Sequence, residues 1–264
     1  MLHTVLLEEL AAQPGGLVAW PLAAPERREA AVARAFARLD EQLSWRQAAQ
    51  NSGSTCVAAV TWPDAGEGQE EPGCQEAAGG SQSTSRRVLL ANLGDSRGLV
   101  LRASVDSGMT ELLGETTDHK PDEPGEWRRI VEANGIVTTG FGPARVDGDL
   151  ALSRAFGDFR LKSRPALPPE RQMVSMVPDV YEFRCCPGDV IVLACDGVFD
   201  VVSSSGVNDL VGKLLLRSED PAAAARGVVL EALDLGSTDN VSCLIVQVLR
   251  ENHMWSRRGG DGGA

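Results

Sequence analysis

Aspartates at the ends of two candidate strands are the residues of this sequence best placed to do chemistry. Asp196-Gly197 closes the apolar run 190–195, and Asp239-Asn240 precedes the apolar run 241–249. A carboxylate at the end of a buried strand is held in place, and carboxylate oxygens are the ligands that Mg²⁺ and Mn²⁺ prefer. If the two strands are neighbours, Asp196 and Asp239 face one divalent ion. The alternative is that each only shapes a turn, because Asp-Gly and Asp-Asn are ordinary turn pairs.

The strands that must position these aspartates follow one another through short turns, which predicts antiparallel pairing. The continuous apolar run 190–194 is typical of a strand buried on both faces. Further strands are expected over residues 55–62 and 241–249. Two hairpins are predicted, each around a glycine-containing turn: residues 87–92 with 98–102 around Gly94-Asp95-Ser96, and residues 181–185 with 189–195 around Cys186-Pro187-Gly188.

Helical periodicity dominates the first 50 residues. Leu2, Leu6, Leu7 and Leu10 recur at helical spacing, and Pro14-Gly15-Gly16 is expected to end that helix. Pro25 opens a second helix, and further helices are predicted over residues 126–133, 207–216 and 221–235. The second helix presents one apolar face, made of Val32, Phe36, Leu39 and Leu43.

These elements predict an α+β fold with antiparallel sheets, because strands follow strands and helices come in pairs. We expect one domain over residues 1–250. Residues 63–86 are rich in Gly, Glu, Ser and Gln and form a flexible insertion loop within it. Residues 251–264 are expected to be a disordered tail.

The charge balance excludes several classes of partner. The 264 residues hold 25 Lys and Arg against 37 Asp and Glu, for a formal net charge of −12. Such a chain is a poor ligand for nucleic acid or anionic lipid, whose affinity comes from Lys and Arg. No stretch approaches the roughly 20 apolar residues of a membrane-spanning helix. The acidic start is unlike a signal peptide, which predicts an intracellular protein, cytoplasmic or nuclear.

Seven strings, spread over about residues 50 to 250, are more specific together than any single motif. They are Ser52-Gly53-Ser54-Thr55, Ala91-Asn92-Leu93-Gly94-Asp95-Ser96-Arg97, Thr117-Asp118-His119-Lys120-Pro121, Leu150-Ala151-Leu152-Ser153-Arg154-Ala155-Phe156-Gly157-Asp158, Val177-Pro178-Asp179-Val180, Leu193-Ala194-Cys195-Asp196-Gly197-Val198-Phe199-Asp200 and Ser237-Thr238-Asp239-Asn240-Val241-Ser242. In this order they closely resemble the metal-dependent protein serine/threonine phosphatases of the protein phosphatase 2C family.

The resemblance implies a sandwich of two antiparallel sheets flanked by helices, acting as a monomer on phosphoprotein substrates. It also implies two Mg²⁺ or Mn²⁺ ions that activate a water, which attacks phosphorus in line. Position by position, Asp196 and Asp239 resemble core metal carboxylates of the family. Asp118 resembles the ligand of a weaker third metal. Asp95 and Asp158 lie in strings that resemble scaffold segments, where an Asp holds a turn.

One departure from the family pattern bears on activity. The family's first metal strand ends in Asp-Gly-His-Gly-Gly, which supplies a bridging carboxylate and a proposed general acid. Neither this string nor an upstream phosphate-binding Arg occurs in the 264 residues, so no catalytic residue is assignable. The resemblance therefore implies a fold that is incomplete at its amino end, and we expect little or no phosphatase activity from this chain. The alternative is a pseudophosphatase, an inactive module that binds phosphoproteins or regulates a partner.

A serine hydrolase is a remote alternative from a different class. Gly94-Asp95-Ser96-Arg97-Gly98 fits the Gly-x-Ser-x-Gly nucleophile elbow. The elbow needs a strand, a sharp turn and then a helix. Here an expected strand follows, and the histidines after Ser96 are only His119 and His253. We expect His119 to order a turn rather than to act in catalysis.

Overall fold

The apolar run before Asp196 forms strand β10 (Val190–Ala194), and all five of its residues are buried. Val190, Val192 and Ala194 contribute to one hydrophobic core, and Ile191 and Leu193 contribute to another, because side chains alternate between the two faces of a strand. The prediction of a strand buried on both faces is confirmed. This computed structural model describes residues 2–12, 20–64, 85–103, 109–140, 142–218 and 220–249.

Two antiparallel sheets form the centre of the molecule. In one the strand order is β11-β10-β4-β5, and in the other it is β2-β3-β9. The strands of the first sheet, besides β10, are β4 (Arg97–Ala103), β5 (Thr110–Glu115) and β11 (Cys243–Gln247). The strands of the second are β2 (Cys56–Pro63), β3 (Arg86–Leu93) and β9 (Asp179–Cys185).

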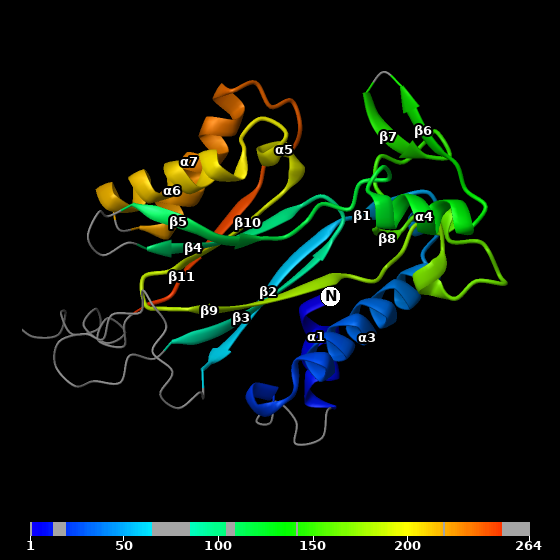
Figure 1. Cartoon of the computed structure of the whole chain (residues 1–264), viewed down its shortest axis with the longest axis horizontal. Coiled ribbons are helices and arrows are strands. Elements are labelled where there is room, and N and C mark those ends of the chain that lie inside the picture. Colours follow the sequence, from blue (N-terminus) through cyan, green and yellow to red (C-terminus); the bar gives the residue numbers. More distant parts are fainter. Residues whose placement is uncertain are drawn as a thin grey trace, which may run out of the picture.

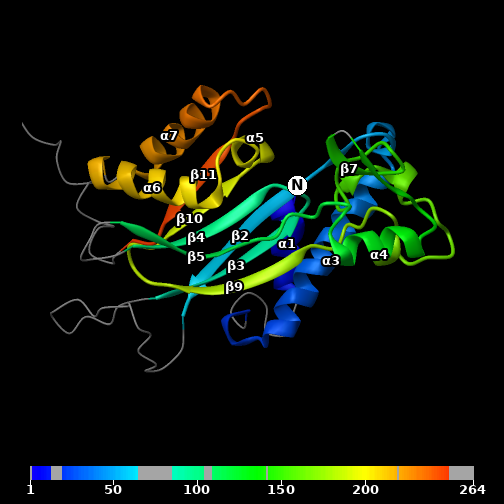
Figure 2. The ribbon, with the colours of Figure 1, turned by 45° about the horizontal axis from the view of Figure 1, so that its top comes forward.

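Helices cover the outer faces of both sheets, which gives four layers (Figure 1). Helices α6 (Ser204–Ser218) and α7 (Pro221–Asp234) pack on the sheet that contains β10, and the short α5 (Asp196–Phe199) follows that strand. Helices α1 (Leu2–Ala11) and α3 (Pro25–Ser44) lie on the other sheet, as the rotated view also shows (Figure 2). A third core, between the sheets, joins β3 to β4 and β10.

Both predicted hairpins are wrong, although the strands themselves are present. Strand β3 pairs with β2 and β9, whereas β4 pairs with β10 and β5. The Gly94-Asp95-Ser96 turn therefore crosses from one sheet to the other, and the turn between β9 and β10 does the same. A strand that is apolar on both faces fits the middle of either sheet, so a short turn does not determine which sheet its partner joins. Gly94 has φ +102°, a value that L side chains rarely adopt.

The buried faces of the first two helices largely agree with the predicted apolar faces. In α3, Val32, Phe36 and Leu39 are buried against α1 and the sheet, and the predicted apolar face is confirmed. In α1, Leu6 is buried but Leu7 is 52% exposed, so the predicted face is wrong at Leu7. The side chains of Leu2 and Leu10, and the stop at residues 14–16, lie outside the described residues.

A smaller region packs beside the sandwich. Helix α4 (Pro124–Glu132) ends two residues before Asn134, which has φ 57°, in agreement with the predicted Asn-Gly stop. The hydrophobic core of this smaller region includes Ile130 and Val146. The strands here, none of which the sequence pattern predicted, are β6 (Val137–Gly140) and β7 (Gly142–Val146), which pair with each other, and β8 (Phe156–Gly157), which pairs with β1 (Gly53–Ser54). Within the described residues, four short 3₁₀ helices complete the elements: Trp20–Leu22, Gln47–Gln50, Phe159–Leu161 and Pro169–Arg171.

The architecture agrees with the predicted α+β sandwich. Most of the predicted insertion 63–86 and the whole of the predicted tail 251–264 lie outside the described residues. Within the described ranges, the structure contains no helix with the length and apolar character that crossing a membrane requires.

Candidate metal centre

The two aspartates that end β10 and precede β11 lie in segments that touch each other. The strands pair antiparallel, with Ala194 opposite Cys243. Beyond that pair, the Cys195 backbone N–H donates to the Ser242 carbonyl at 3.2 Å, and the Ser242 N–H donates to Cys195 Sγ at 3.2 Å. Ser237 Oγ donates to the Gly197 carbonyl at 2.7 Å. These contacts hold residues 195–197 against residues 237–242.

Gly197 allows this close approach. A Cβ at residue 197 would lie 2.5 Å from the Asn240 carbonyl oxygen and 3.5 Å from Asp239 Cβ. The first distance is shorter than real Cβ contacts, so a larger residue would push the two segments apart. The neighbour that approaches Gly197 is the Asp239-Asn240 turn.

The electrostatic surroundings of Asp196 are strongly negative. Burial raises the pKa of the Asp196 carboxyl, and the charges of Asp95, Asp239 and Asp200 raise it further, against the opposing effect of the Gly197 N–H. No ion pair in the described part of the chain involves Asp196 or Asp239. A cation placed beside them would relieve this repulsion.

The other aspartates near this centre already have basic partners. Asp95 is buried in the sheet-to-sheet turn and pairs with Lys120. Asp118 accepts two hydrogen bonds from Arg97, Nε to Oδ1 at 3.0 Å and Nη2 to Oδ2 at 2.9 Å. A divalent ion at Asp118 must therefore share or displace this guanidinium.

The donor set fits one divalent cation better than two. Asp196 and Asp239 offer hard carboxylate oxygens without a basic competitor, as Mg²⁺ and Mn²⁺ require. Across the described residues, however, no three His, Cys, Asp or Glu side chains come together in a group that could hold a metal ion. These residues therefore fit one ion whose shell includes water, and they do not by themselves complete a two-ion centre.

His119 orders a turn, as predicted. The ring is 2% exposed, its Nδ1 accepts from the Gly94 N–H at 2.9 Å, and its Nε2 lies 3.2 Å from Asp179 Oδ2. Because Nδ1 accepts, Nε2 carries the proton and donates to Asp179. Burial alone would raise the pKa of Asp179, but the His119 hydrogen bond and the charge of Arg154 lower it to about 2.

Ser96 lacks the surroundings of a hydrolase nucleophile. The residue is buried, and its hydroxyl lies 2.9 Å from Thr55 Oγ1. Strand β4 follows it where an elbow needs a helix. The two ring nitrogens of His119 are engaged by Gly94 and Asp179, so this histidine does not serve Ser96 as a base.

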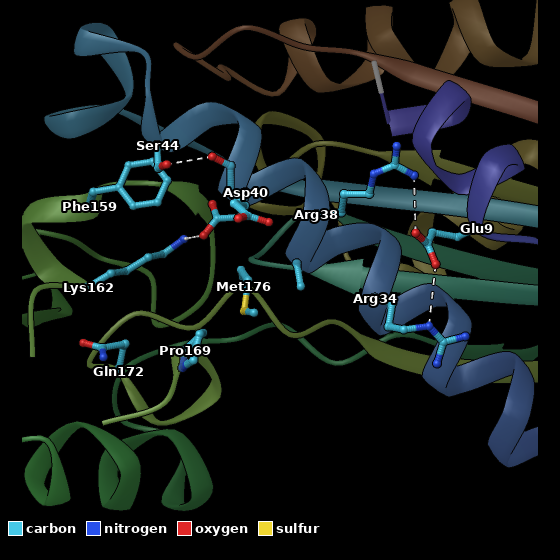
Figure 3. A pocket seen from close by; sticks show the side chains of 12 residues that line it. Glu9, Arg34, Arg38, Asp40, Ser44, Phe159, Lys162, Pro169, Gln172 and Met176 are labelled. Carbon is cyan, nitrogen blue, oxygen red and sulfur yellow. Dashed lines mark hydrogen bonds and ion pairs between the residues drawn. The ribbon is translucent and has the colours of Figure 1, made fainter. Parts of the chain in front are cut away.

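A separate cavity of about 630 Å³ lies between α1, α3 and the 159–176 segment (Figure 3). None of Asp118, Asp196 and Asp239 lines it. Its basic groups are already matched by acids: Lys162 pairs with Asp40, and Arg38 pairs with Glu8 and Glu9. Among the described ion pairs, the cavity therefore offers no unmatched basic group for phosphate chemistry.

Three charged residues of the centre were not predicted as part of it. Asp95 was expected only to hold a turn, and Asp200 and Arg97 were assigned no role. Asp200 lies four residues after Asp196, one helical turn along α5 and its C-terminal cap, and that spacing is the signal that could have found it. Asp95 and Arg97 come close only because residues 94–96 cross between the sheets, which local sequence does not show.

Comparison with known proteins gives one family. The family model described as protein phosphatase 2C matches residues 21–241. The chain is 32% identical over 220 residues to protein phosphatase ppm-1.A of Caenorhabditis elegans, covering 83% of this chain and 40% of that protein. It is 35% identical over 216 residues to protein phosphatase 1B of Bos taurus, covering 80% of this chain and 38% of that protein. The chain thus spans about two fifths of the length of these relatives.

Solved structures show the same architecture. A phosphatase from a pathogenic strain of Toxoplasma gondii aligns with a TM-score of 0.67 and 30% identity, covering 94% of this chain and 81% of that one. A sex determining protein of C. elegans aligns with a TM-score of 0.64 and 25% identity, covering 94% of this chain and 52% of that one. These alignments confirm the predicted α+β sandwich.

Proposed function

The chain belongs to the protein phosphatase 2C family, and from this premise we propose that it serves metal-dependent dephosphorylation of phosphoserine and phosphothreonine in proteins. The substrate is a phosphoprotein, and the protein acts as an intracellular monomer. The cofactor is Mg²⁺ or Mn²⁺, held by Asp196 and Asp239, with Asp118 as the ligand of a weaker additional ion. The cation, when bound, supplies an activated water and neutralises phosphoryl oxygens.

One observation carries this proposal. Asp196 and Asp239 come from segments in direct contact, and neither has a basic partner in the described ion pairs, whereas Asp95 and Asp118 each have one. Carboxylates concentrated without a counter-charge cost stability unless a cation joins them. Gly197 keeps the two segments close, and their own backbone N–H groups orient both carboxylates: Gly197 N donates to Asp196 Oδ1 at 2.9 Å, and Asn240 N donates to Asp239 Oδ1 at 2.6 Å.

We propose further that these 264 residues turn over substrate slowly by themselves. They contain no Asp-Gly-His string, so Asp196 and Asp239 must hold the cation with two negative charges rather than three. A centre that binds one ion loses the clamp on attacking and leaving oxygens that a paired-metal site provides.

The test measures cation binding and turnover separately on purified residues 1–264. Isothermal titration with Mn²⁺ is expected to show a site that weakens at least about tenfold in Asp196→Asn and in Asp239→Asn. An exposed aspartate outside the centre, changed in Asp122→Asn, is the matched control and should leave Mn²⁺ binding unchanged. Hydrolysis of a phosphothreonine peptide with Mn²⁺ should stay near background.

Two results would contradict this proposal. Mn²⁺ binding that is unchanged in both Asp196→Asn and Asp239→Asn would remove the metal assignment. Turnover at a rate normal for the family, abolished by Asp196→Ala, would keep the metal assignment and overturn the impairment.

A pseudophosphatase is the second candidate, and the pairing of Asp118 with Arg97 favours it. Both oxygens of Asp118 are occupied by the chain's own cation, so less of the centre is open to metal ions. This candidate predicts that a phosphopeptide binds without hydrolysis and with little dependence on Mn²⁺. Fluorescence anisotropy of a labelled phosphopeptide, with and without EDTA, separates it from the enzyme.

A further inference from the structure

The guanidinium of Arg97 joins four parts of the molecule beside the candidate metal centre. Besides its two hydrogen bonds to Asp118, its Nη1 donates to Ser204 Oγ at 2.7 Å and lies 3.7 Å from Glu115 Oε2. Its central carbon stacks 4.6 Å from the centroid of the Phe199 ring. Arg97 thereby links β4 to β5, α5, α6 and the segment that contains Asp118.

Negative charge exceeds positive charge around this guanidinium. Asp118, Glu115 and Asp200 all act on Arg97 electrostatically. In the ion pairs of the described residues, Asp118 and Glu115 have Arg97 as their only basic partner. One positive charge therefore serves three carboxylates, and removing it would leave Asp118 and Glu115 without a basic partner among the described ion pairs.

Arg97 can release Asp118 without losing all of its partners. The hydroxyl of Ser204, the carboxylate of Glu115 and the face of Phe199 contact the guanidinium independently of Asp118. An arginine that leaves one carboxylate while keeping a hydrogen bond and an aromatic face loses less free energy than one left with no partner. The geometry thus provides two states for Asp118, one bound to Arg97 and one open to a metal ion.

We propose that Arg97 is an internal cation that competes with divalent metal for Asp118 and so sets the metal affinity of this side of the centre. This inference rests on the proposed role of Asp118 as a metal ligand. A Mn²⁺ ion binds Asp118 when the guanidinium withdraws toward Ser204 and Glu115. Arg97 is in this view a positioning residue for the metal, and it does not touch the reacting atoms.

The test counts bound Mn²⁺ in purified residues 1–264 by isothermal titration and by electron paramagnetic resonance of the free ion. Arg97→Gln is expected to bind Mn²⁺ at least about tenfold more tightly at its weakest site, or to bind one more equivalent. The double variant Arg97→Gln/Asp118→Asn should lose that gain. Arg171→Gln, which removes an exposed pair with Glu132, is the matched arginine control and should bind Mn²⁺ as the unaltered protein does.

A folding defect and a failure of the proposed function are both distinguishable from a failure of this inference. Circular dichroism establishes that each variant is folded, and Arg97→Lys, which keeps the charge but loses the two-pronged contact, should give an intermediate gain if Arg97→Gln does not fold. If only the assignment of a metal site to Asp196 and Asp239 is wrong, Asp196→Asn will leave Mn²⁺ binding unchanged while Arg97→Gln still increases it. Unchanged Mn²⁺ affinity and stoichiometry in both folded Arg97 variants, or a gain that persists in the double variant, would overturn the competition.

Discussion

Two groups of carboxylates in this protein differ in whether basic side chains of the chain pair with them. Around Arg154, the carboxylates of Glu126 and Asp179 bind the guanidinium at 2.6 to 3.0 Å, and Arg129 adds a second positive charge. At the ends of β10 and β11, Asp196 and Asp239 have no basic partner among the described ion pairs. The first group is neutralised from within the chain, and the second is not.

The pKa directions express the same difference. Burial would raise the pKa of Glu126, but Arg154 and Arg129 lower it below its ordinary value. Burial raises the pKa of Asp196, and its neighbours add to the increase. A carboxylate whose pKa falls on folding stabilises the fold, whereas one whose pKa rises is retained at a cost to stability. The direction of the pKa shift therefore separates a carboxylate that stabilises the fold from one that does not.

Breaking the neutralised group should have the largest effect. Arg154→Ala leaves the buried Glu126 with Arg129 alone and the partly exposed Asp179 with His119 alone. We expect the free energy of unfolding to fall by about 3 kcal/mol, at the lower end for breaking a buried ion pair. Urea denaturation followed by circular dichroism measures the change. Arg171→Ala, which removes an exposed pair with Glu132, should change stability by no more than about 0.5 kcal/mol. A loss below about 1 kcal/mol for Arg154→Ala would show that the two groups do not differ in this way.

Separating the two strand ends should have the next largest effect. Gly197→Ala places a Cβ 2.5 Å from the Asn240 carbonyl oxygen, and relieving that overlap is expected to cost about 1–3 kcal/mol. Mn²⁺ binding should weaken as well, because Asp196 and Asp239 move apart. Gly125→Ala is the control, since a Cβ at that glycine meets nothing within 4 Å. Unchanged stability and Mn²⁺ affinity in Gly197→Ala would contradict the close approach.

A smaller effect with a change of sign should follow from removing one unneutralised charge. Asp196→Asn is expected to stabilise the metal-free protein by no more than about 1 kcal/mol, allowing for solvent screening of this half-buried group. With excess Mn²⁺ the order should reverse, because the unaltered protein gains more binding free energy than the variant. Thermal denaturation with EDTA and with Mn²⁺ gives both values. If Asp196→Asn destabilises the metal-free protein, the repulsion at this centre is refuted.

The smallest effect is confined to acid pH. The pKa of Asp179 is lowered from its ordinary value of 3.8 to about 2. The resulting stabilisation is complete above about pH 5 and is lost as the pH falls through the ordinary pKa toward the folded-state pKa. Urea denaturation between pH 5 and pH 2.5 should therefore show that the free energy of unfolding decreases as the pH falls. This decrease should be shallower in Asp179→Asn. An equal slope in both proteins would assign the acid sensitivity to other carboxylates.

The sequence allowed the elements of the fold to be predicted better than their pairing. The apolar run 190–194 and the face of α3 follow from hydrophobic periodicity alone, and both are confirmed. Strand β5 was missed because Leu113 interrupts its alternation and is 41% exposed. The pairing of the strands into two sheets was predicted wrongly. Strand pairing depends on contacts between residues distant in sequence, which hydrophobic periodicity and turn length do not determine.

The candidate centre divides in the same way. Asp196 and Asp239 were predicted from their positions beside strands, and the pairing of β10 with β11 brings their segments together. Their metal role remains a prediction. Arg97 could not be predicted as the partner of Asp118, because nothing in local sequence relates residue 97 to residue 118 across two strands and a turn.

The crossing at residues 94–96 has a mechanical consequence. Asp95 lies in the only few residues that connect β3 to β4, so its position is fixed by both layers of the sandwich at once. Its charge acts on Asp196 at the end of β10. A slip of one layer over the other would change the distance between these carboxylates and hence the local field. The alignment of the two layers thereby sets the electrostatic field at Asp196, and strain applied far from this residue would change that field.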